Sequence, residues 1–555
     1  MANTHENITS VTDKDAHPFE HDENIDSKED HQHLEDGSNN APVGADWNEV
    51  RNDAIKAEEV EHAMSVRKAL SVYRSAVLWS AAISLVIVMD GYDTGLLSSI
   101  NGIPAYRQKY GHYSGTAKGG YQLNPAWQTA ITEASIVGNF IGIFISSWFQ
   151  DKYGYKRTIQ IGLVLLTGFI FIVFYAPSVQ VMFIGQLLCG MPWGAFSSSA
   201  VSYASEVTPI SLRGYLTTYV NLCWVVGQFI AAGVLKAVAD RTDQWGYKIP
   251  FAIQWVWPVP LFILATLAPE SPWFYVRKGR LADAERSVTR LAKKGEDADP
   301  TQIVAMMVRT NEVELKNRPG TSYLDCFKGS DLRRTEIACF AWAAQIMSGT
   351  SFANQPAYFF QQAGFSTSNS FNLNLGAKAL AFIGTCGSWI TLTYLGRRPV
   401  FVIGLGTLTV LLVLVGAVAF PAVHNQNAGW GQAALIILWI FIYDFTVGPV
   451  TYAIVGEASS TRLRSKTVGL ARNLYNVSRI IAGFLYTYQV NPTGWNWKGK
   501  AGFFWGGTCF VAFLWAYFRL PEFKGRSFRE LDILFERNVP ARKFKSTQVS
   551  EEDEQ

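Results

Sequence analysis

Charged residues are scarce in this chain of 555 residues, and the scarcity is concentrated in its middle. They make up 17% of the sequence, whereas a soluble protein typically has about 25%. Residues 1–73 and 520–555 are highly charged, but the long stretch between them is nearly bare, and 49% of all residues are hydrophobic. Because a bilayer core excludes isolated charges, this distribution predicts a polytopic membrane protein.

Other absences exclude whole classes of function. The six cysteines have no paired spacing, so we expect neither disulfides nor a metal site, and we expect no cofactor. A net charge of +3 is too small to indicate a nucleic-acid partner. The sequence has no nucleophile–base set and no phosphate-binding loop, so we do not expect an enzyme. The first apolar run begins near residue 76, behind polar sequence, and we therefore expect no secretory signal peptide.

Twelve apolar segments, each close to the ~20 residues that a helix needs to cross a bilayer, divide into two sets of six. They lie at about 74–98, 126–149, 157–176, 179–202, 214–236, 249–268, 336–360, 371–394, 399–420, 432–455, 467–489 and 500–519. We predict an all-α fold with one six-helix bundle at 74–268 and another at 336–519. A helical loop at 269–335, with helical patterning in Leu281–Lys294 and Thr301–Leu315, joins them. A disordered tail at 1–73 and a second tail at 520–555 flank them.

Lysine and arginine in the short loops set the orientation in the membrane. The loops after the third, seventh and ninth segments contain neither residue. The loops after the second, eighth and tenth segments are basic, through Lys152, Lys156, Arg157, Arg397, Arg398, Arg462, Arg464 and Lys466. We therefore place these basic loops, both termini and the 269–335 loop in the cytoplasm. The first long loop, with Arg107, Lys109 and Lys118, is the one exception of any size.

An internal repeat indicates that the two sets of segments are related. Glu206 and Arg213, after the fourth segment, recur with the same spacing as Glu457 and Arg464 after the tenth. In the same way, Pro269-Glu270 after the sixth segment recurs as Pro521-Glu522 after the twelfth. Two halves of one fold, related by an axis along the membrane normal, would produce this pattern.

The motif set resembles that of the sugar porters of the major facilitator superfamily. It comprises Asp151–Arg157, Gly396–Arg398, the two Glu-to-Arg repeats, Pro269–Pro272 and Pro521-Glu522. In addition, Asn473–Asn476, Trp495–Gly507 and Val539–Phe544 are similar to the fungal maltose and α-glucoside permeases. The resemblance implies the major facilitator fold, a central sugar site, alternating access and, for the α-glucoside branch, proton symport at the plasma membrane. The partners would be a disaccharide, a proton and the lipid membrane, and we expect a monomer.

Ionisable residues inside the apolar segments are the candidates for proton coupling. Placing a carboxylate inside a membrane span costs roughly 2.5–3.5 kcal/mol of insertion free energy. Such residues therefore either form a functional site or destabilise the protein. The acids are Asp90, Asp93, Glu133 and Asp444, and the bases are Lys378, Arg472 and Arg479. His112 and His424 fall in loops, so a carboxylate must carry any coupled proton.

The resemblance implies that Asp93 is the coupling acid and that Asp90, Glu133 and Arg472 belong with it. It favours Arg472 as the counter-charge, whereas depth along the helix favours Arg479, and the sequence leaves both open. Many proton-linked sugar porters have an arginine in the fourth segment that partners this acid, but this chain has Gln186. Because an amide cannot hold a carboxylate ionised, we expect the partner to come from another helix.

Sugar binding requires polar side chains for the hydroxyls and aromatic faces for the ring. The resemblance implies a substrate site made of Asn221, Gln228, Gln345, Ser351, Tyr475, Asn476 and Gln186. For each polar residue, the alternative is a hydrogen bond between helices. Val447 stands where the family usually has a tryptophan, which predicts a wider cavity that suits a disaccharide.

Charged residues at the cytoplasmic ends of the segments are expected to form a latch. They are Asp151, Arg157, Glu206, Arg213, Glu270, Arg397, Arg398, Glu457 and Arg464. We expect charge pairs among them to hold the outward-open state and to break when the protein opens inward. Orientation by positive charge alone would explain the arginines but not the recurring glutamates.

The leading hypothesis is a proton-coupled importer of α-glucosides such as maltose. One alternative is a uniporter that only equilibrates sugar across the membrane. Another is a non-transporting sugar sensor of the same fold, but such sensors usually carry a long cytoplasmic signalling tail, and only residues 520–555 follow the twelfth segment here.

Overall fold

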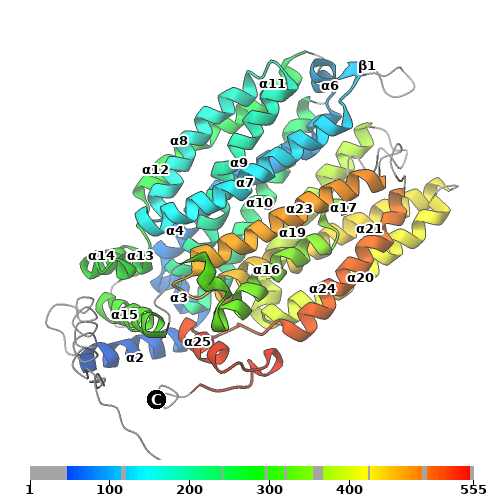
Figure 1. Cartoon of the computed structure of the whole chain (residues 1–555). Coiled ribbons are helices and arrows are strands. Elements are labelled where there is room, and N and C mark those ends of the chain that lie inside the picture. Colours follow the sequence, from blue (N-terminus) through cyan, green and yellow to red (C-terminus); the bar gives the residue numbers. More distant parts are fainter. Residues whose placement is uncertain are drawn as a thin grey trace, which may run out of the picture. The chain divides into compact units, whose positions relative to one another are not determined.

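Helices dominate the fold because backbone N–H and C=O groups inside a bilayer must be satisfied within the chain. The computed structural model describes residues 47–549 except 114–120, 239–240, 242, 294, 296–297, 318–321, 354–359, 361–366, 423–424, 491–494 and 496. Within this part, strands β1 (His112–Tyr113) and β2 (Tyr121–Gln122) form a short antiparallel ribbon, and the other regular elements are helices (Figure 1). The prediction of an all-α fold is confirmed.

The first half contains the six helices predicted for it. They are α4 (Arg74–Ser84) with α5 (Val86–Ser99), α7 (Pro125–Tyr153), α8 (Tyr155–Phe174), α9 (Val179–Val207), α10 (Ile210–Val238), and a sixth helix made of α11 (Trp245–Ala252), the 3₁₀ turn η3 (Ile253–Val256) and α12 (Pro258–Leu267). Pro250 and Pro258 lie around the 3₁₀ turn, where the loss of backbone donors interrupts the helix. The short elements η1 (Ile100–Gly102) and α6 (Pro104–Tyr110) follow α5.

The second half repeats this arrangement. Its helices are α16 (Gly329–Met347) with α17 (Thr350–Ala353), α19 (Thr367–Tyr394), α20 (Arg397–Ala422), α21 (Gln426–Phe445) with α22 (Val447–Ala458), α23 (Arg464–Val490), η5 (Lys498–Lys500) and α24 (Ala501–Arg519). The seventh helix starts at Gly329, earlier than predicted, and it breaks at Gly349, whose φ of +90° is a left-handed conformation. Residues 354–359 of the seventh segment and His424 lie outside the described residues.

In the described part of the chain, ten helices are long and apolar enough to cross a membrane. The other two predicted spans, α16 and α23, are not among these ten because they are more polar. Charged residues occur along α23 and in the first turns of α16, namely Arg464, Lys466, Arg472, Arg479, Asp331, Arg333, Arg334 and Glu336. The two helices pack against each other, as expected when protein must cover the polar face of a spanning helix.

Shorter helices gather at one end of the long ones (Figure 1). Between the halves lie α13 (Pro272–Arg277), α14 (Leu281–Leu291), α15 (Pro300–Asn317) and η4 (Tyr323–Phe327), and α14 and α15 match the two predicted helical patterns. The terminal segments contain α2 (Trp47–Ala63), α3 (Val66–Val72), α25 (Phe528–Glu536) and η6 (Ala541–Lys543).

The helices α2 and α3 correct the expectation of disorder up to residue 73. Val50, Ala54 and Ala57 recur at helical spacing in α2, and all three are buried. The high charge of the segment as a whole conceals this narrow apolar stripe. The predicted tail up to residue 46 lies outside the described residues.

Two buried glutamates cap helices at corresponding positions of the two halves. Glu270 accepts hydrogen bonds from the first two backbone N–H groups of α8, both at 3.0 Å. Glu522 accepts the same bonds from α20, at 2.9 and 3.2 Å. A carboxylate at a helix N-terminus satisfies donors that have no partner within the helix and interacts favourably with its dipole. The recurring Pro-Glu motif is therefore a helix cap, and Glu270 holds α8 inside its own half instead of joining the predicted latch.

Each cap requires a glycine. Gly154 precedes α8 with φ +87°, and Gly396 precedes α20 with φ +91°. A Cβ at Gly154 would lie 2.4 Å from an oxygen of Glu270, and one at Gly396 would lie 2.6 Å from an oxygen of Glu522. Burial raises the pKa of Glu270 to about 7, while the backbone N–H groups that it caps act to lower it.

We predict that Gly154→Ala and Gly396→Ala each lower the thermal midpoint of the purified protein. An L-residue in this region of φ/ψ space costs of order 1–3 kcal/mol, and the new methyl group would displace the capping carboxylate. Gly168→Ala is the matched control, because it lies in α8 and a Cβ there meets nothing within 4 Å. Thermal unfolding followed by tryptophan fluorescence measures the difference, and equal midpoints for all three variants would contradict the capping interpretation.

Candidate functional site

A cavity between the two halves brings most of the predicted sugar-binding residues together. The space between its lining atoms, together with the part that is open to solvent, amounts to about 400 Å³. Its lining comes from α10 in the first half and from α16, α21, α22 and α23 in the second, and consists of Asn221, Trp224, Val225, Gln228, Gln345, Tyr443, Asp444, Tyr452, Arg472 and Tyr475. Amides, aromatic rings and charged groups share this surface, which is the composition of a site for a polar solute that also has apolar faces.

A second cavity, of about 730 Å³, adjoins the first and shares Trp224, Gln228 and Tyr475 with it. Its further polar lining consists of Thr94, Ser98, Thr132, Glu133, Ser135, Thr350, Ser351, Lys378 and Arg479. Glu133 lies near the start of α7, and Asp151, at the other end of this helix, lies among the basic loops. The second cavity therefore lies on the side of the first that is away from those loops.

Five of the seven predicted substrate residues line these cavities. They are Asn221 and Gln345 in the first, Ser351 in the second, and Gln228 and Tyr475 in both. The side chain of Gln345 also has a structural contact, because its Nε2 donates to the carbonyl oxygen of Gly448 at 2.9 Å. This bond joins α16 to the first turn of α22.

The remaining two predicted substrate residues lie outside both cavities. Asn476 Nδ2 donates to Asn139 Oδ1 at 2.8 Å, and both residues are buried. Asn476 therefore makes a hydrogen bond between helices, which is the alternative to sugar binding. This bond joins α23 of the second half to α7 of the first. Gln186 is buried in α9, and its Oε1 has no hydrogen-bond partner among the described residues.

The expected widening of the cavity at Val447 is wrong. Val447 is fully buried and is not among the residues that line either cavity. It packs against α20, where a Cβ on Gly404 would lie 3.0 Å from its Cγ2. The aromatic ring that α22 contributes to the cavity is that of Tyr452.

The partner of Asp93 is a residue that the sequence analysis missed. Gln254 Nε2 donates to Asp93 Oδ1 at 2.8 Å, and both side chains are buried. Gln254 lies in η3, the interruption of the sixth helix between Pro250 and Pro258. A buried glutamine between two prolines of a membrane span is the signal that could have identified it.

Both candidate arginines lie near acids of the other half, so each alternative has structural support. Arg479 lies within electrostatic reach of Glu133, and Gly483, one turn further along α23, leaves room for the Glu133 carboxylate. Asp90 interacts electrostatically with both arginines, and its interaction with Arg472 is the stronger one. The guanidinium group of Arg472 also lies over the ring of Tyr475, at 4.5 Å, a cation–π contact that lowers the cost of burying its charge.

A second charged group at the cavities comes from the second half. Lys378 of α19 is buried, and its Nζ donates to Gln228 Oε1 of α10 at 2.7 Å. Asp444, at the end of α21, is the electrostatic neighbour of Lys378, and the Asn221 side chain lies close to Asp444 in the lining of the first cavity. The sequence contains both charges but does not reveal that α19 brings the lysine to a predicted sugar-binding glutamine.

Glu206 is the centre of the ion pairs among the predicted latch residues. Its Oε1 lies 3.1 Å from Arg277 Nη1 and 3.6 Å from Arg464 Nη1, and it accepts a hydrogen bond from the Tyr155 hydroxyl at 3.0 Å. Arg277, which the sequence analysis missed, also donates to the carbonyl oxygen of Thr461 at 3.2 Å. Burial by itself lowers the pKa of Arg277, but the Glu206 carboxylate beside it raises this pKa above its usual value. Because Arg464 and Thr461 belong to the second half, these contacts join the halves.

Asp151 makes a second link between the halves. It accepts a hydrogen bond from Ser465 Oγ at 2.9 Å and forms an ion pair with Lys466. Arg397 and Glu457, by contrast, form a two-pronged pair at 2.6 and 3.0 Å within the second half.

The other three predicted latch residues make no ion pair among the described residues. Arg157 is exposed. Arg398 donates to the carbonyl oxygen of Tyr517 at 2.9 Å within the second half. Arg213 lies over the ring of Phe528, 3.6 Å from its centre.

Two sets of membrane-crossing helices, a polar cavity between them and charge pairs that close one end define a carrier that moves a polar solute across a membrane. The chain belongs to the sugar transporter family, because the model described as "Sugar (and other) transporter" matches residues 79–535. The family consists of transporters and not of enzymes. In the part of the chain that the structure describes, no cluster of histidine, cysteine and acidic residues could hold a metal ion.

Curated relatives support this assignment over most of the chain. A maltose permease of Saccharomyces cerevisiae is 39% identical over 518 residues, which cover 92% of this chain and 84% of that protein. A general alpha-glucoside permease of Saccharomyces cerevisiae is 38% identical over 533 residues, which cover 93% and 86%.

Solved structures share the fold. The proton:xylose symporter XylE, a major facilitator superfamily protein solved with 6-bromo-6-deoxy-D-glucose, matches with a TM-score of 0.70 at 19% identity, covering 84% of this chain and all of that one. XylE of E. coli in an inward-open conformation matches with a TM-score of 0.58 at 17% identity, covering 83% and 99%.

We predict that Lys378→Gln strongly reduces sugar uptake per molecule at the cell surface. Removing one partner of a buried charge pair leaves Asp444 uncompensated, which typically costs 3–5 kcal/mol. The double variant Lys378→Gln with Asp444→Asn should recover uptake, since no buried charge is left alone. Lys236→Gln is the matched control, because Lys236 bridges the same two helices to Asn372 outside both cavities. A double variant no better than Lys378→Gln would contradict the pairing.

Proposed function

We propose that this chain is a proton-coupled importer of α-glucosides such as maltose and that it works at the plasma membrane by alternating access. The observation that carries the proposal is the pair of adjoining cavities, in which amide, hydroxyl and aromatic side chains of both halves lie beside two membrane-embedded carboxylates, Asp444 and Glu133. The names of the curated relatives, a maltose permease and a general alpha-glucoside permease, point to the same substrates.

Sugar would bind in the first cavity and extend into the second. The amides of Asn221 and Gln228 and the hydroxyl of Tyr475 can pair with sugar hydroxyls, and the rings of Trp224 and Tyr452 offer flat apolar faces. A disaccharide would lie along the line of the two adjoining cavities, which share Trp224, Gln228 and Tyr475. A sugar hydroxyl would then either replace Lys378 Nζ as the hydrogen-bond partner of Gln228 Oε1 or form an additional hydrogen bond to the same oxygen.

The proton would be carried by Asp93, with Glu133 and Asp90 as its neighbours. Asp93 has a neutral hydrogen-bond donor, Gln254, while Glu133 and Asp90 lie near arginines of the other half. When the halves move, the distance from these acids to Arg479 and Arg472 changes, and so does the relative stability of their charged forms. Loading and release of a proton would therefore follow the movement of the halves.

Release into the cell would require the latch to open. The contacts of Glu206 with Arg464 and of Asp151 with Lys466 join the cytoplasmic ends of the two halves. A rigid-body movement that exposes the cavities to the cytoplasm breaks both. We place both termini and α13–α15 in the cytoplasm on the basis of the basic loops, and the unit would be a monomer.

A uniporter and a non-transporting sensor are the two other functions to be tested. A uniporter needs no membrane-embedded acid, so Asp93 and Glu133, which both lie inside predicted spans, favour symport. A sensor needs no latch that breaks in each cycle, so the charge pairs that join the halves favour transport.

We predict that Asp93→Asn abolishes uphill accumulation of labelled maltose and leaves some downhill exchange. The asparagine keeps the size of the side chain and a bond to Gln254 but cannot bind or release a proton. Accumulation in cells that lack other α-glucoside permeases, with and without a protonophore, measures the effect. Proton-dependent accumulation by the variant would show that Asp93 is not the coupling acid.

We further predict that Arg479→Gln loses accumulation at near-neutral pH and that adding Glu133→Gln restores downhill transport. The single change leaves the Glu133 carboxylate without its counter-charge, whereas the double change leaves neither charge alone. Arg472→Gln with Glu133→Gln is the comparison, since Arg472 lies nearest Asp90, and it should not recover. If the two double variants behave alike, the assignment of Glu133 to Arg479 is wrong.

A further inference from the structure

The helix α2 is bonded to the first half of the transporter. Glu61 accepts a hydrogen bond from the backbone N–H of Ile210, the first residue of α10, at 2.7 Å. This carboxylate caps α10 in the way that Glu270 and Glu522 cap α8 and α20. Next to it, Met64 belongs to a small buried apolar cluster with Ala69, Leu212 and Leu216, so α2 and α3 are packed on the start of α10.

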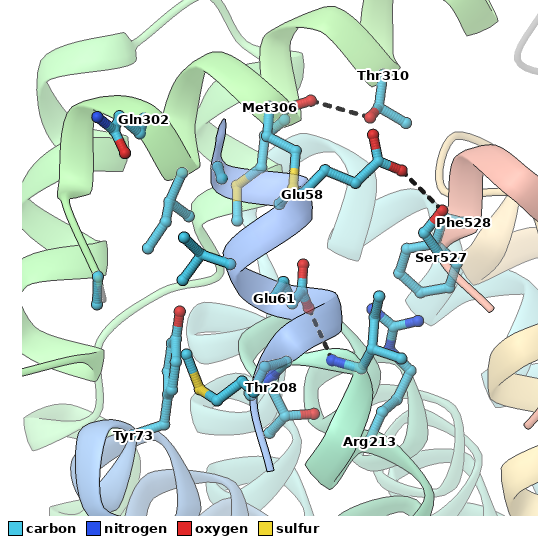
Figure 2. A pocket seen from close by; sticks show the side chains of 18 of the residues that line it. Glu58, Glu61, Tyr73, Thr208, Arg213, Gln302, Met306, Thr310, Ser527 and Phe528 are labelled. Carbon is cyan, nitrogen blue, oxygen red and sulfur yellow. Dashed lines mark hydrogen bonds between the residues drawn. The ribbon is translucent and has the colours of Figure 1, made fainter. Parts of the chain in front are cut away.

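One turn earlier, α2 is also bonded to the C-terminal helix α25. Glu58 accepts hydrogen bonds from Ser527 Oγ at 3.0 Å and from Arg529 Nη1 at 2.9 Å. His62 lies 3.5 Å from Glu530. Figure 2 shows these two acids of α2 pointing in different directions, Glu58 towards Ser527 and Glu61 towards the start of α10. The helix α2 thus connects α10, through Glu61, to α25, through Glu58.

The helix α25 is in turn anchored to the second half. Arg334 in the first turns of α16 forms an ion pair with Asp532. Arg333 donates to the carbonyl oxygen of Val539 at 2.7 Å, just beyond α25. On its apolar side, Leu531, Leu534 and Phe535 are buried.

A ring of α25 also lies between the halves themselves. The Phe528 side chain has the guanidinium of Arg213 at 3.6 Å and that of Arg464 at 4.1 Å from its ring centre. Arg213 belongs to α10 and Arg464 to α23, so one aromatic ring contacts the corresponding arginine of each half. Phe528 can make both cation–π contacts only while the two halves are close together. The position of α25 therefore depends on that arrangement.

We propose that α2 is a clasp that holds the cytoplasmic ends of the two halves together, by joining α10 to α25, and that it must release before the transporter opens inward. The two halves cannot separate at this end while Glu61 stays on α10 and Glu58 stays on Ser527 and Arg529. The clasp is distinct from the latch because its residues lie in the N-terminal segment and the C-terminal helix and not in the loops between spans.

The experiment is a charge exchange on the Glu58–Arg529 pair, in which both side chains are 16% exposed. Hydrogen–deuterium exchange of the purified full-length protein reports opening directly, at the amide of Ile210 and in the first turn of α25. Glu58→Arg and Arg529→Glu should each speed exchange at both places by about fivefold, the factor that corresponds to about 1 kcal/mol. The double variant Glu58→Arg with Arg529→Glu should return exchange towards the wild-type rate. Lys56→Glu is the control, since Lys56 lies in α2, is largely exposed and forms its ion pair with Asp53 of the same helix.

Uptake provides an independent measurement. If the clasp holds the cytoplasmic end closed, the single variants shift molecules towards the inward-open state and raise the sugar concentration for half-maximal uptake, because fewer molecules can bind sugar from outside. The charge-exchanged double variant and Lys56→Glu should be near wild type. Unchanged exchange in both single variants would overturn the proposal, as would a double variant as defective as either single one, which would indicate misfolding instead of a lost pair. The exchange measurement does not depend on which sugar the protein carries.

Discussion

Charge buried inside a membrane is the constraint on which this structure depends. Three acids of the first half, Asp90, Asp93 and Glu133, lie inside membrane-spanning helices, and their arginine neighbours come from α23 of the second half. Each charge is tolerable only while a partner is near it. In the proposed function, moving one half past the other would change the protonation free energy of these acids, and this change would link a proton to the movement.

Ion pairs also join the halves at the end of the helices where the short basic loops lie. Glu206 with Arg464 and Asp151 with Lys466 join the halves, whereas the recurring Pro-Glu motif caps helices within each half. Among the repeated acids, Glu270 and Glu522 cap helices within each half, Glu457 pairs with Arg397 in its own half, and Glu206 contacts Arg464 of the other half. Rigid halves with a reversible connection are what alternating access requires.

Hydropathy and charge alone locate most of the helices, because a membrane span leaves a long apolar run in the sequence. They do not show which helices adjoin. The pairing of Asp93 with Gln254 depends on the bend at η3, and the contact of Lys378 with Gln228 depends on α19 lying against α10. Residues matched by resemblance, such as Asn221 and Gln228, lie at the cavity, but Val447 and Asn476 do not, since one step along a helix turns a side chain by about 100°. The sequence likewise does not predict the helix α2, because its buried apolar stripe contains only a few residues.

Sugar-driven proton movement is the most direct test of this account. Maltose is added to a weakly buffered suspension of cells that express this chain as their only α-glucoside permease, and the external pH is recorded. The account predicts an immediate rise in external pH that is absent with a protonophore and absent in cells without the protein. Uptake of labelled maltose with no accompanying pH change would contradict it, because the buried carboxylates would then carry no proton.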